Sequence, residues 1–403
     1  MKILHINTVC GLGSTGSIAA DIAAECEKRG HAYYIAYGQG DTAYHRSFKI
    51  GGRWENHLHN LVCSRLLGMQ GYGTYRGTKK LIAWMRELAP DVVHLGNLHG
   101  NYLNLPLLFD YLRQSRIPVV LTLHDCWAFT GKCSHYTAAG CYKWKTQCEA
   151  CPQYRKYPPT LFFDRSARLF RDKRNWFTSL ARLQVVLAVS QWLKQEAEES
   201  FLGKWPVSRI YNWVDSTRFR RVVPDETFCR KYRLPEGCKF LVSISAGWNE
   251  HSSKYRDAVN LASKLPSDYR LLLVGSVNRG TTIAPPICHI PYIADPGDLS
   301  AVYSLATAYV HLSVEDTFGK VIAEAMACGT PPIVFDSTAC PEIAAEYGFA
   351  VAPHDVDAIV ALLPRVESIT PAHREKLIEY VRTNYDYAEN TGRYLEIYEQ
   401  MIS

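Results

Sequence analysis

Long apolar runs, a signal-peptide core and low-complexity segments are all missing from this sequence. No stretch of its 403 residues approaches the ~18 consecutive apolar residues that a membrane-spanning helix requires. Residues 1–7 enter a predicted strand directly, without the apolar core of a signal peptide. With 47% hydrophobic and 21% charged residues, the composition is that of a globular protein. We therefore expect a cytoplasmic protein, whose length suits two domains of about 200 residues each.

A strong charge of one sign is also lacking, since the formal net charge is only +6. The most basic stretch, residues 143–182, holds ten Lys or Arg and three Asp or Glu, with aromatic residues among them. It predicts either a solvated helix face with an apolar reverse side, or a surface for anionic lipid or a lipid-linked diphosphate. The second interpretation implies peripheral contact with the inner face of the plasma membrane. Because no nucleic-acid module accompanies the stretch, we expect no nucleic-acid partner.

Cysteine is plentiful, but its distribution does not suit a disulfide framework. The count of 13 is odd, and a signal peptide is missing. Four cysteines follow a spacing whose Cys-x2-Cys end fits two ligands of a tetrahedral zinc ion: Cys133, Cys141, Cys148 and Cys151. We expect these four to bind one structural zinc ion. Disulfides, or unligated thiols in a packed loop, are the alternatives.

The most informative stretch is residues 308–336. Its apolar run at 308–312 predicts a buried strand, and apolar residues at helical spacing follow from Phe318 to Met326. Asp316 and Thr317 are expected to start that helix by accepting its free N–H groups. Gly329 is expected to end the helix in a left-handed conformation, before a second strand at 333–335. Such a β-α-β crossover predicts a parallel sheet.

Two carboxylates in this unit, Asp316 and Glu324, are separated by seven residues. Asp316 follows a strand at its carboxyl end, where open α/β sheets bind ligands. Carboxylates at such a position can accept the hydroxyl hydrogen bonds of a ribose or hexose. The N–H groups of Phe318, Gly319 and Lys320 could hold an anion at the start of the helix. The alternative is a capping aspartate and a solvated glutamate.

The whole string from Asp316 to Pro331 resembles the signature of glycosyltransferase family 4, whose members are retaining enzymes of the GT-B fold. The family pattern is Glu-x7-Glu followed by Ala-Met-Ala-x-Gly-x-Pro, and Asp316 here replaces the first Glu. The resemblance implies that the first carboxylate contacts the donor sugar and that Glu324 contacts the nucleotide ribose. It also implies an α/β architecture of two Rossmann-like domains facing a central cleft, with a C-terminal helix that crosses back to the first domain.

A glycine-rich loop at residues 10–16 follows the first predicted strand. Its candidate anion-binding positions are Gly11, Gly13 and Gly16, because glycine lets backbone N–H groups approach an anion closely. The second predicted strand, residues 33–38, lacks the acidic residue of a dinucleotide-binding enzyme at its end, which argues against a dehydrogenase. In the resembling family, a loop at this position approaches the donor diphosphate and the acceptor.

Three histidines follow or end predicted strands of the first domain. His94 and His99 lie at the end of the strand 91–95 and beyond it, and His124 follows the strand 118–123. The string His124-Asp-Cys-Trp127 resembles a recurring pattern of this family, which implies contact between His124 and the donor sugar. His94 and His99 are candidates for the acceptor side.

The basic clamp of the family, Arg-x4-Lys, is absent from residues 246–256. Lys254 is the best substitute, with Arg256 and His251 as rivals. The resemblance also implies that the loop 290–295, which contains Tyr292, contacts the nucleotide base. The complete set of expected donor-binding residues is Gly11, Gly13, Gly16, Lys254, Tyr292, Thr317, Phe318, Gly319 and Lys320.

Together these features predict a retaining glycosyltransferase with catalytic residues His124, Asp316 and Glu324. We expect domain 1 at residues 1–208, with a cysteine-rich insertion at about 126–152 and completion by the helix 386–403, and a donor domain at 209–385. The insertion resembles that of an exopolysaccharide, capsule or colanic-acid branch, which implies transfer of a nucleotide-diphosphate sugar to a glycan or lipid-linked acceptor. No catalytic metal is expected. A sugar-nucleotide 2-epimerase and a non-catalytic assembly protein of the same fold are the alternatives.

Overall fold

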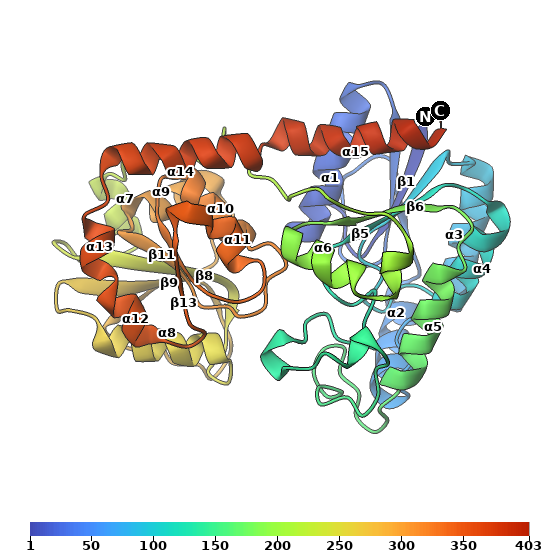
Figure 1. Ribbon diagram of the computed structural model, residues 1–403, viewed down its shortest axis with the longest axis horizontal. Helices are drawn as coiled ribbons and strands as arrows, with labels where there is room; N and C mark the ends of the chain where they lie inside the picture. Colours follow the sequence, from blue (N-terminus) through green and yellow to red (C-terminus); the bar gives the residue numbers. More distant parts are fainter. Residues whose placement is uncertain (403) are drawn as a thin grey trace. The chain divides into compact units, whose positions relative to one another are not determined.

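The computed structural model describes residues 1–402 and divides into two compact units. Unit 1 comprises Met1–Ile210 and the C-terminal segment from Ala388 onward, and unit 2 comprises Tyr211–Tyr387. The domain boundaries expected from the sequence were 208/209 and 385/386. Each unit is built on one parallel sheet with helices, so the expected α/β class with two Rossmann-like domains is confirmed (Figure 1).

The sheet of unit 1 has seven parallel strands in the order β3-β2-β1-β4-β5-β6-β7. The strands are β1 (Lys2–Asn7), β2 (Ala32–Tyr37), β3 (Ser47–Lys49), β4 (Val92–Leu95), β5 (Val119–Leu123), β6 (Leu183–Ala188) and β7 (Val207–Arg209). The helices are α1 (Gly13–Lys28), α2 (Arg53–Leu58), α3 (Tyr75–Leu88), α4 (Leu105–Ser115), α5 (Ser166–Thr178), α6 (Gln191–Glu198) and α15 (Tyr387–Ile402), and a π-helical segment, His59–Leu66, continues α2.

Strands β4 and β5 are buried along their whole length, which explains why they consist almost entirely of apolar residues. The strand order reverses direction between β1 and β4. The loops that follow these two strands therefore lie at the position where doubly wound sheets bind ligands.

The last helix, α15, packs on the sheet of unit 1 although it is remote from that sheet in sequence. Its Tyr398 hydroxyl lies 2.8 Å from Nδ1 of His94 in β4, and both side chains are fully buried. Its Glu399 lies 3.4 Å from His31, just beyond α1, and Figure 1 shows α15 beside α1. These contacts make the C-terminal segment part of the core of unit 1.

The sheet of unit 2 has six parallel strands in the order β10-β9-β8-β11-β12-β13. The strands are β8 (Lys239–Trp248), β9 (Tyr269–Val277), β10 (Ile287–Ile290), β11 (Ala308–His311), β12 (Pro332–Phe335) and β13 (Phe349–Val351). The helices are α7 (Glu226–Lys231), α8 (Ser253–Lys264), α9 (Pro296–Leu305), α10 (Lys320–Ala327), α11 (Cys340–Ala344), α12 (Val356–Ala361), α13 (Leu363–Glu367) and α14 (Pro371–Asn384).

The reversal of strand order in unit 2 falls between β8 and β11. The turn after β8 leads into α8, and the loop after β11 leads into α10. A core that includes Leu241, Leu271, Val310 and Ile333 holds the neighbouring strands together. These two connections are therefore fixed side by side at the carboxyl edge of the sheet.

The predicted start of helix α10 was wrong by about one turn. The helix begins at Lys320, after Gly319, whose φ is +79°. Asp316 and Thr317 thus precede the helix and leave Asp316 available for other contacts. The predicted end is confirmed, because Gly329 adopts a φ of +73° just beyond the helix.

Within residues 1–402, none of the helices has both the length and the apolar character that crossing a membrane requires.

Candidate functional site

Asp316 and Lys254 lie on the two connections at the strand reversal of unit 2. Lys254 is in the first turn of α8, and its Nζ donates a hydrogen bond to Ser245 of β8. Burial lowers the pKa of Lys254, and the Asp316 carboxylate opposes that shift, so the two opposite charges are near enough to interact. Its rivals from the sequence, Arg256 and His251, are exposed. The geometry therefore favours Lys254 as the cation of this site.

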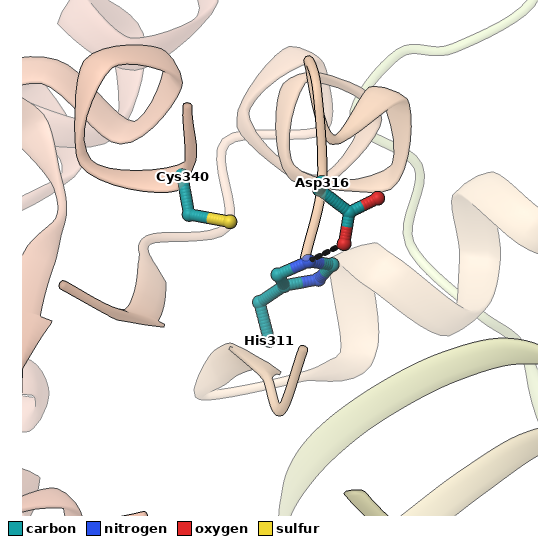
Figure 2. A group of neighbouring side chains, drawn as sticks. All are labelled: His311, Asp316 and Cys340. Carbon is teal, nitrogen blue, oxygen red and sulfur yellow. Dashed lines mark hydrogen bonds and ion pairs between the residues drawn. The ribbon is translucent and has the colours of Figure 1, made fainter. Parts of the chain in front are cut away.

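A histidine in strand β11 holds the Asp316 side chain. His311 Nε2 lies 2.8 Å from Asp316 Oδ2 (Figure 2). On the other side of the ring, His311 Nδ1 lies 3.0 Å from the Tyr309 hydroxyl. The Asp316 N–H donates to Thr338 Oγ1 at 3.2 Å. The short aspartate is thus fixed at both its backbone and its carboxylate, a feature that sequence reasoning missed.

His311 is buried in this arrangement. Burial opposes its protonation, but the oxygen atoms of Tyr309 and Asp316 and the sulfur of Cys340 favour it more strongly, which holds the pKa of His311 well above its usual value. Ligand atoms of His311, Asp316 and Cys340 all lie within 4.8 Å of one another. Because a hydrogen bond already joins the imidazole to the carboxylate, the cluster acts as a support for Asp316.

Glu324 lies in α10 and is buried rather than solvated. Its side chain is only 7% exposed, and the Tyr303 hydroxyl donates to its Oε2 at 3.1 Å. Burial raises the pKa of Glu324 to about 7, against the opposing effects of Lys320, Tyr303 and Arg218. The solvated-glutamate alternative is therefore wrong. A buried carboxylate with one protein donor retains acceptor capacity for a ligand hydroxyl.

The other expected donor residues of unit 2 differ in exposure. Thr317 and Phe318 are buried, and the Phe318 ring packs edge-on against Tyr385, with the ring centroids 5.3 Å apart. Any ligand contact of Phe318 would therefore use its backbone. Tyr292, in contrast, is 65% exposed in the loop between β10 and α9.

In unit 1, the glycine-rich loop connects β1 to α1. Gly11 and Gly13 have φ values of +74° and +62°, and Gly16 lies in the first turns of α1. A side chain at Gly16 would meet Val9 and the Gly11 backbone within 3.0–3.1 Å. The Gly11 N–H already donates to the Gly16 carbonyl at 3.0 Å. Gly11 therefore shapes the loop, and its own N–H is engaged internally.

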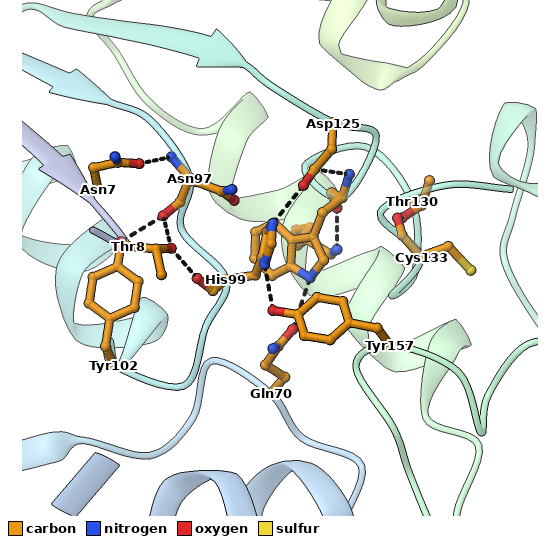
Figure 3. Close-up of polar contacts among 12 residues, drawn as sticks. Asn7, Thr8, Gln70, Asn97, His99, Tyr102, Asp125, Thr130, Cys133 and Tyr157 are labelled. Carbon is orange, nitrogen blue, oxygen red and sulfur yellow. Dashed lines mark hydrogen bonds and ion pairs between the residues drawn. The ribbon is translucent and has the colours of Figure 1, made fainter. Parts of the chain in front are cut away.

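Polar side chains from the loops after β4 and β5 form one cluster in unit 1 (Figure 3). His99 Nε2 lies 2.6 Å from Asp125 Oδ2, and His99 Nδ1 lies 2.7 Å from the Tyr157 hydroxyl. The Trp127 N–H donates to Asp125 Oδ1 at 2.8 Å. Burial would raise the pKa of Asp125, but His99 and the Trp127 N–H lower it below its usual value. The structure thus pairs Asp125 with His99, at the carboxyl edge of the sheet.

His124 lines a small cavity at the ends of β4 and β5, together with Gly96, Asn97 and Trp127. Burial lowers the pKa of His124 to about 4, despite the nearby Asp125 carboxylate. The imidazole is therefore neutral at pH 7, as a hydroxyl-binding histidine should be.

The prediction that His94 contacts an acceptor was wrong. His94 is fully buried in β4, with its ring stacked on His5 at a centroid distance of 4.0 Å. Its Nε2 lies 2.7 Å from Thr122 Oγ1, and its Nδ1 lies 2.8 Å from the Tyr398 hydroxyl. The residue joins the sheet to α15 and has no surface left for a ligand.

A broad polar pocket beside β2 and α2 in unit 1 was not predicted from the sequence. Its lining residues are Gly38, Gln39, Gly40, Asp41, Lys49, Arg53, Asn56, His57 and Asn60. Lys49, Arg53 and His57 contribute basic groups to its lining. The glycines at 38 and 40, directly after β2, were the only sign of this pocket in the sequence.

The four cysteines of the predicted metal site, Cys133, Cys141, Cys148 and Cys151, line one cavity in the connection between β5 and α5. None of them forms a disulfide in the structure.

The family of the chain follows from comparison with known proteins. Residues 15–218 match the model described as Glycosyltransferase Family 4, and residues 258–384 match the model described as Glycosyl transferases group 1. The first match alone covers half of the chain. This protein therefore belongs to glycosyltransferase family 4 and is a transferase, and its fold is GT-B.

Among curated proteins, the chain is 24% identical over 361 residues to WcaC of Escherichia coli strain K12, a glycosyl transferase assigned to colanic acid biosynthesis. That match covers 86% of each protein. The chain is also 26% identical over 231 residues to the O-antigen chain mannosyltransferase B of Escherichia coli, covering 52% of this chain and 56% of the relative.

Among solved structures, sucrose-phosphate synthase from Thermosynechococcus elongatus has a TM-score of 0.70 at 16% identity, covering 99% of this chain and 98% of that one. HepE of Anabaena, in complex with UDP and glucose, has a TM-score of 0.66 at 15% identity, covering 99% of this chain and 100% of that one. These similarities establish the fold.

Proposed function

We propose that this protein is a retaining glycosyltransferase that moves a sugar from a nucleotide-diphosphate sugar to a glycan or lipid-linked acceptor during synthesis of a cell-surface polysaccharide. The observation that carries the proposal is the electrostatic interaction of Lys254 with Asp316 at the strand reversal of unit 2, with buried Glu324 in the next helix. UDP and glucose in the related HepE structure support the donor class, and the names of WcaC and the O-antigen mannosyltransferase support the pathway.

In this proposal, the residues of unit 2 bind the donor. Glu324 accepts hydrogen bonds from the ribose hydroxyls, and Asp316 orients the donor sugar. His311 keeps the Asp316 carboxylate in place through the 2.8 Å hydrogen bond. The backbone N–H groups of Phe318, Gly319 and Lys320, at the start of α10, suit a phosphate.

Departure of the nucleotide diphosphate leaves negative charge that the protein must stabilise. A positioned cation in a partly buried site does this more effectively than solvent, because it needs no reorganisation during the reaction. Lys254 is the proposed cation, since its ammonium group is held by Ser245 and lies within electrostatic range of Asp316. The departing phosphate accepts the acceptor proton in this scheme, so we assign no protein general base.

On unit 1, we propose that His124 contacts the donor sugar and that His99 belongs to the acceptor side. His99 is held from two directions by Asp125 and Tyr157, which suits a positioning role. The polar pocket beside β2 and α2, where Arg53 and His57 accompany the 2.6 Å ion pair of Lys49 with Asp41, is the proposed contact for an anionic acceptor group.

We also propose that unit 1 rests on an anionic membrane that supplies the acceptor. An apolar patch is exposed on α2, on the π-helical segment and on the loop before α5: Trp54, Leu58, Leu61, Leu67, Leu161, Phe162 and Phe163. The two parts of the patch are joined, because the Leu161 N–H donates to the Arg65 carbonyl at 2.8 Å. Exposed Arg155, Lys156 and Arg165 flank it. Aromatic side chains with basic neighbours are suited to a membrane interface.

A mass-spectrometric screen tests the proposed reaction. Purified protein is incubated with a panel of nucleotide sugars, with and without a lipid-linked acceptor extract, and an Asp316→Asn variant serves as the control. We expect a glycosylated acceptor that requires one donor and is lost in the variant. Conversion of the donor without acceptor would instead indicate an epimerase, and no conversion with any donor would contradict the proposal.

A further inference from the structure

The connection between β5 and α5 is long and has little regular secondary structure. It runs from residue 124 to residue 165 and contains only two short 3₁₀ turns, Thr137–Ala139 and Lys143–Lys145. Loops of this length without secondary structure are uncommon in compact domains unless something fixes them. Yet several of its side chains are buried, among them Phe129, Tyr136 and Trp144. An additional constraint is therefore needed to hold the segment in one conformation.

All four cysteines of this connection face the same cavity. Cys133, Cys141, Cys148 and Cys151 line it together with Trp144. The sulfur atoms of Cys133 and Cys151 are 4.0 Å apart. Two thiolates on a tetrahedral zinc ion, each with a Zn–S bond of about 2.3 Å, are about 3.8 Å apart. This pair is therefore already at the separation that a shared zinc ion requires.

Polar groups around the cavity point toward sulfur. The Gly131 N–H donates to Cys148 Sγ at 3.2 Å, and the Gln153 amide lies 3.8 Å from Cys133 Sγ. Hydrogen bonds to coordinating atoms are a regular part of the surroundings of a metal ion, because they orient the ligands and spread their charge. A side chain at Gly131 would come within 2.8 Å of the Cys148 Cβ, so glycine allows this close approach.

Two lysines are buried near the cysteines, and burial lowers the pKa of both, that of Lys173 to about 7. Lys132 and Lys173 are 3% and 1% exposed, and their ammonium groups donate to backbone carbonyls of Tyr154 and Trp127. Within residues 1–402, neither forms an ion pair with a carboxylate. The sulfur atoms of Cys133 and Cys148 lie within electrostatic range of Lys173. Since four thiolates on one Zn²⁺ carry a net negative charge, such a centre would favour the protonated form of both lysines and be balanced by it.

We propose that Cys133, Cys141, Cys148 and Cys151 bind one structural zinc ion. The Cys133–Cys151 pair provides the preformed half of the site, and Cys141 and Cys148, which line the same cavity, complete it on binding. A disulfide between Cys133 and Cys151 is the competing state, but their separation is about twice a disulfide bond length. The zinc ion would also fix Tyr157, six residues beyond Cys151, against His99.

The test is metal analysis of the full chain, purified with reductant and without chelators from zinc-supplemented cells. We expect about one zinc ion per chain, and loss of at least 80% of it in Cys148→Ser and in Cys151→Ser. Cys229→Ser, which changes a half-buried cysteine of unit 2, should keep its zinc and its melting temperature. Wild-type protein treated with a mercurial reagent should release its zinc to a chromogenic chelator, which tests the ligands even where a variant fails to fold.

Two results would overturn this inference. One is wild-type protein that contains less than a tenth of an equivalent of zinc and binds none when zinc is added to the reduced chain. The other is a Cys133–Cys151 disulfide peptide recovered in high yield from protein of normal stability.

Discussion

His311 Nε2 lies 2.8 Å from Asp316 Oδ2, so a buried histidine, whose pKa is raised above its usual value, holds the first carboxylate of the family signature. Family members usually have the longer glutamate at this position. We propose that the hydrogen bond compensates for the shorter side chain by orienting the Asp316 carboxylate, which interacts electrostatically with Lys254. In that case the departure from the signature would be compatible with transfer.

Replacement of His311 by Ala should impair transfer through loss of that orientation. Misplacement of a contact group by about one ångström can reduce a rate on the order of a hundredfold. We expect kcat to fall by tenfold to a hundredfold, while the affinity for free nucleotide stays within about threefold of wild type. Steady-state kinetics and calorimetry separate the two effects. Equal losses in both quantities would make His311 a general structural residue.

Glu324 should make nucleotide binding dependent on pH. Its pKa is raised to about 7 by burial, so the carboxyl is largely protonated at pH 6 and ionised at pH 8. The ionised form accepts stronger hydrogen bonds from ribose hydroxyls, worth roughly 1.5–3 kcal/mol each. Nucleotide affinity should therefore rise between pH 6 and pH 8, and Glu324→Ala should bind more than tenfold more weakly at pH 8. A wild-type affinity that is flat with pH, and equal to that of the variant, would refute the assignment.

The Glu324 carboxyl should also make the stability of the fold depend on pH. Nucleotide affinity should rise with pH, whereas this contribution to stability should fall. The pKa of Glu324 in the folded state lies above its usual value of 4.5, so the protonated form is favoured by folding. The resulting contribution is present below pH 4.5 and is lost as pH rises through about 7, a change on the order of 3 kcal/mol in the free energy of unfolding. Glu324→Gln should remove this pH dependence in urea titrations of the nucleotide-free protein. An unchanged slope in that variant would assign the effect to other groups.

His124→Ala should lose most transferase activity and keep nucleotide affinity within a few-fold. The neutral imidazole lines a cavity at the sheet edge and can hold a sugar hydroxyl without a buried charge. Melting temperature is the control measurement. A large drop in melting temperature with a proportionate loss of activity would show that His124 serves the core.

Membrane contact should depend on the apolar patch. Replacing Phe162 and Phe163 by Asp should lower partition onto vesicles rich in anionic lipid by more than tenfold, because it removes apolar area and adds negative charge at the interface. Tyr292→Asp, at an exposed aromatic of unit 2, is the matched control. Sedimentation with vesicles measures the effect. Wild-type protein that stays in the supernatant at low salt would rule out the proposed contact.

The sequence predicted the β11-α10-β12 segment well, because most of its features depend on residues that are neighbours in the sequence. Apolar strands, helical spacing and a left-handed glycine at 329 are properties of neighbouring residues. The start of α10 was misplaced since Gly319 adopts a left-handed conformation that separates Asp316 from the helix. Sequence spacing alone does not reveal which glycine takes that conformation.

The burial of Glu324 and His94 could not be predicted in the same way. Glu324 is on a helix whose residues 322–327 are all buried, because other helices surround it. His94 is opposite His5 in the pairing of β1 with β4 and is covered by Tyr398, which is 304 residues away in sequence. Both outcomes depend on elements that become neighbours only in the folded chain.

Calorimetric titration of UDP, GDP and ADP into the wild-type chain and into Lys254→Ala tests the central claim most directly, namely that the strand reversal of unit 2 binds a nucleotide diphosphate. We predict that at least one nucleotide binds with one-to-one stoichiometry and that Lys254→Ala weakens it more than tenfold, while the exposed control His251→Ala leaves it unchanged. Failure of all three nucleotides to bind the wild-type chain, or equal affinity in Lys254→Ala, would contradict the account.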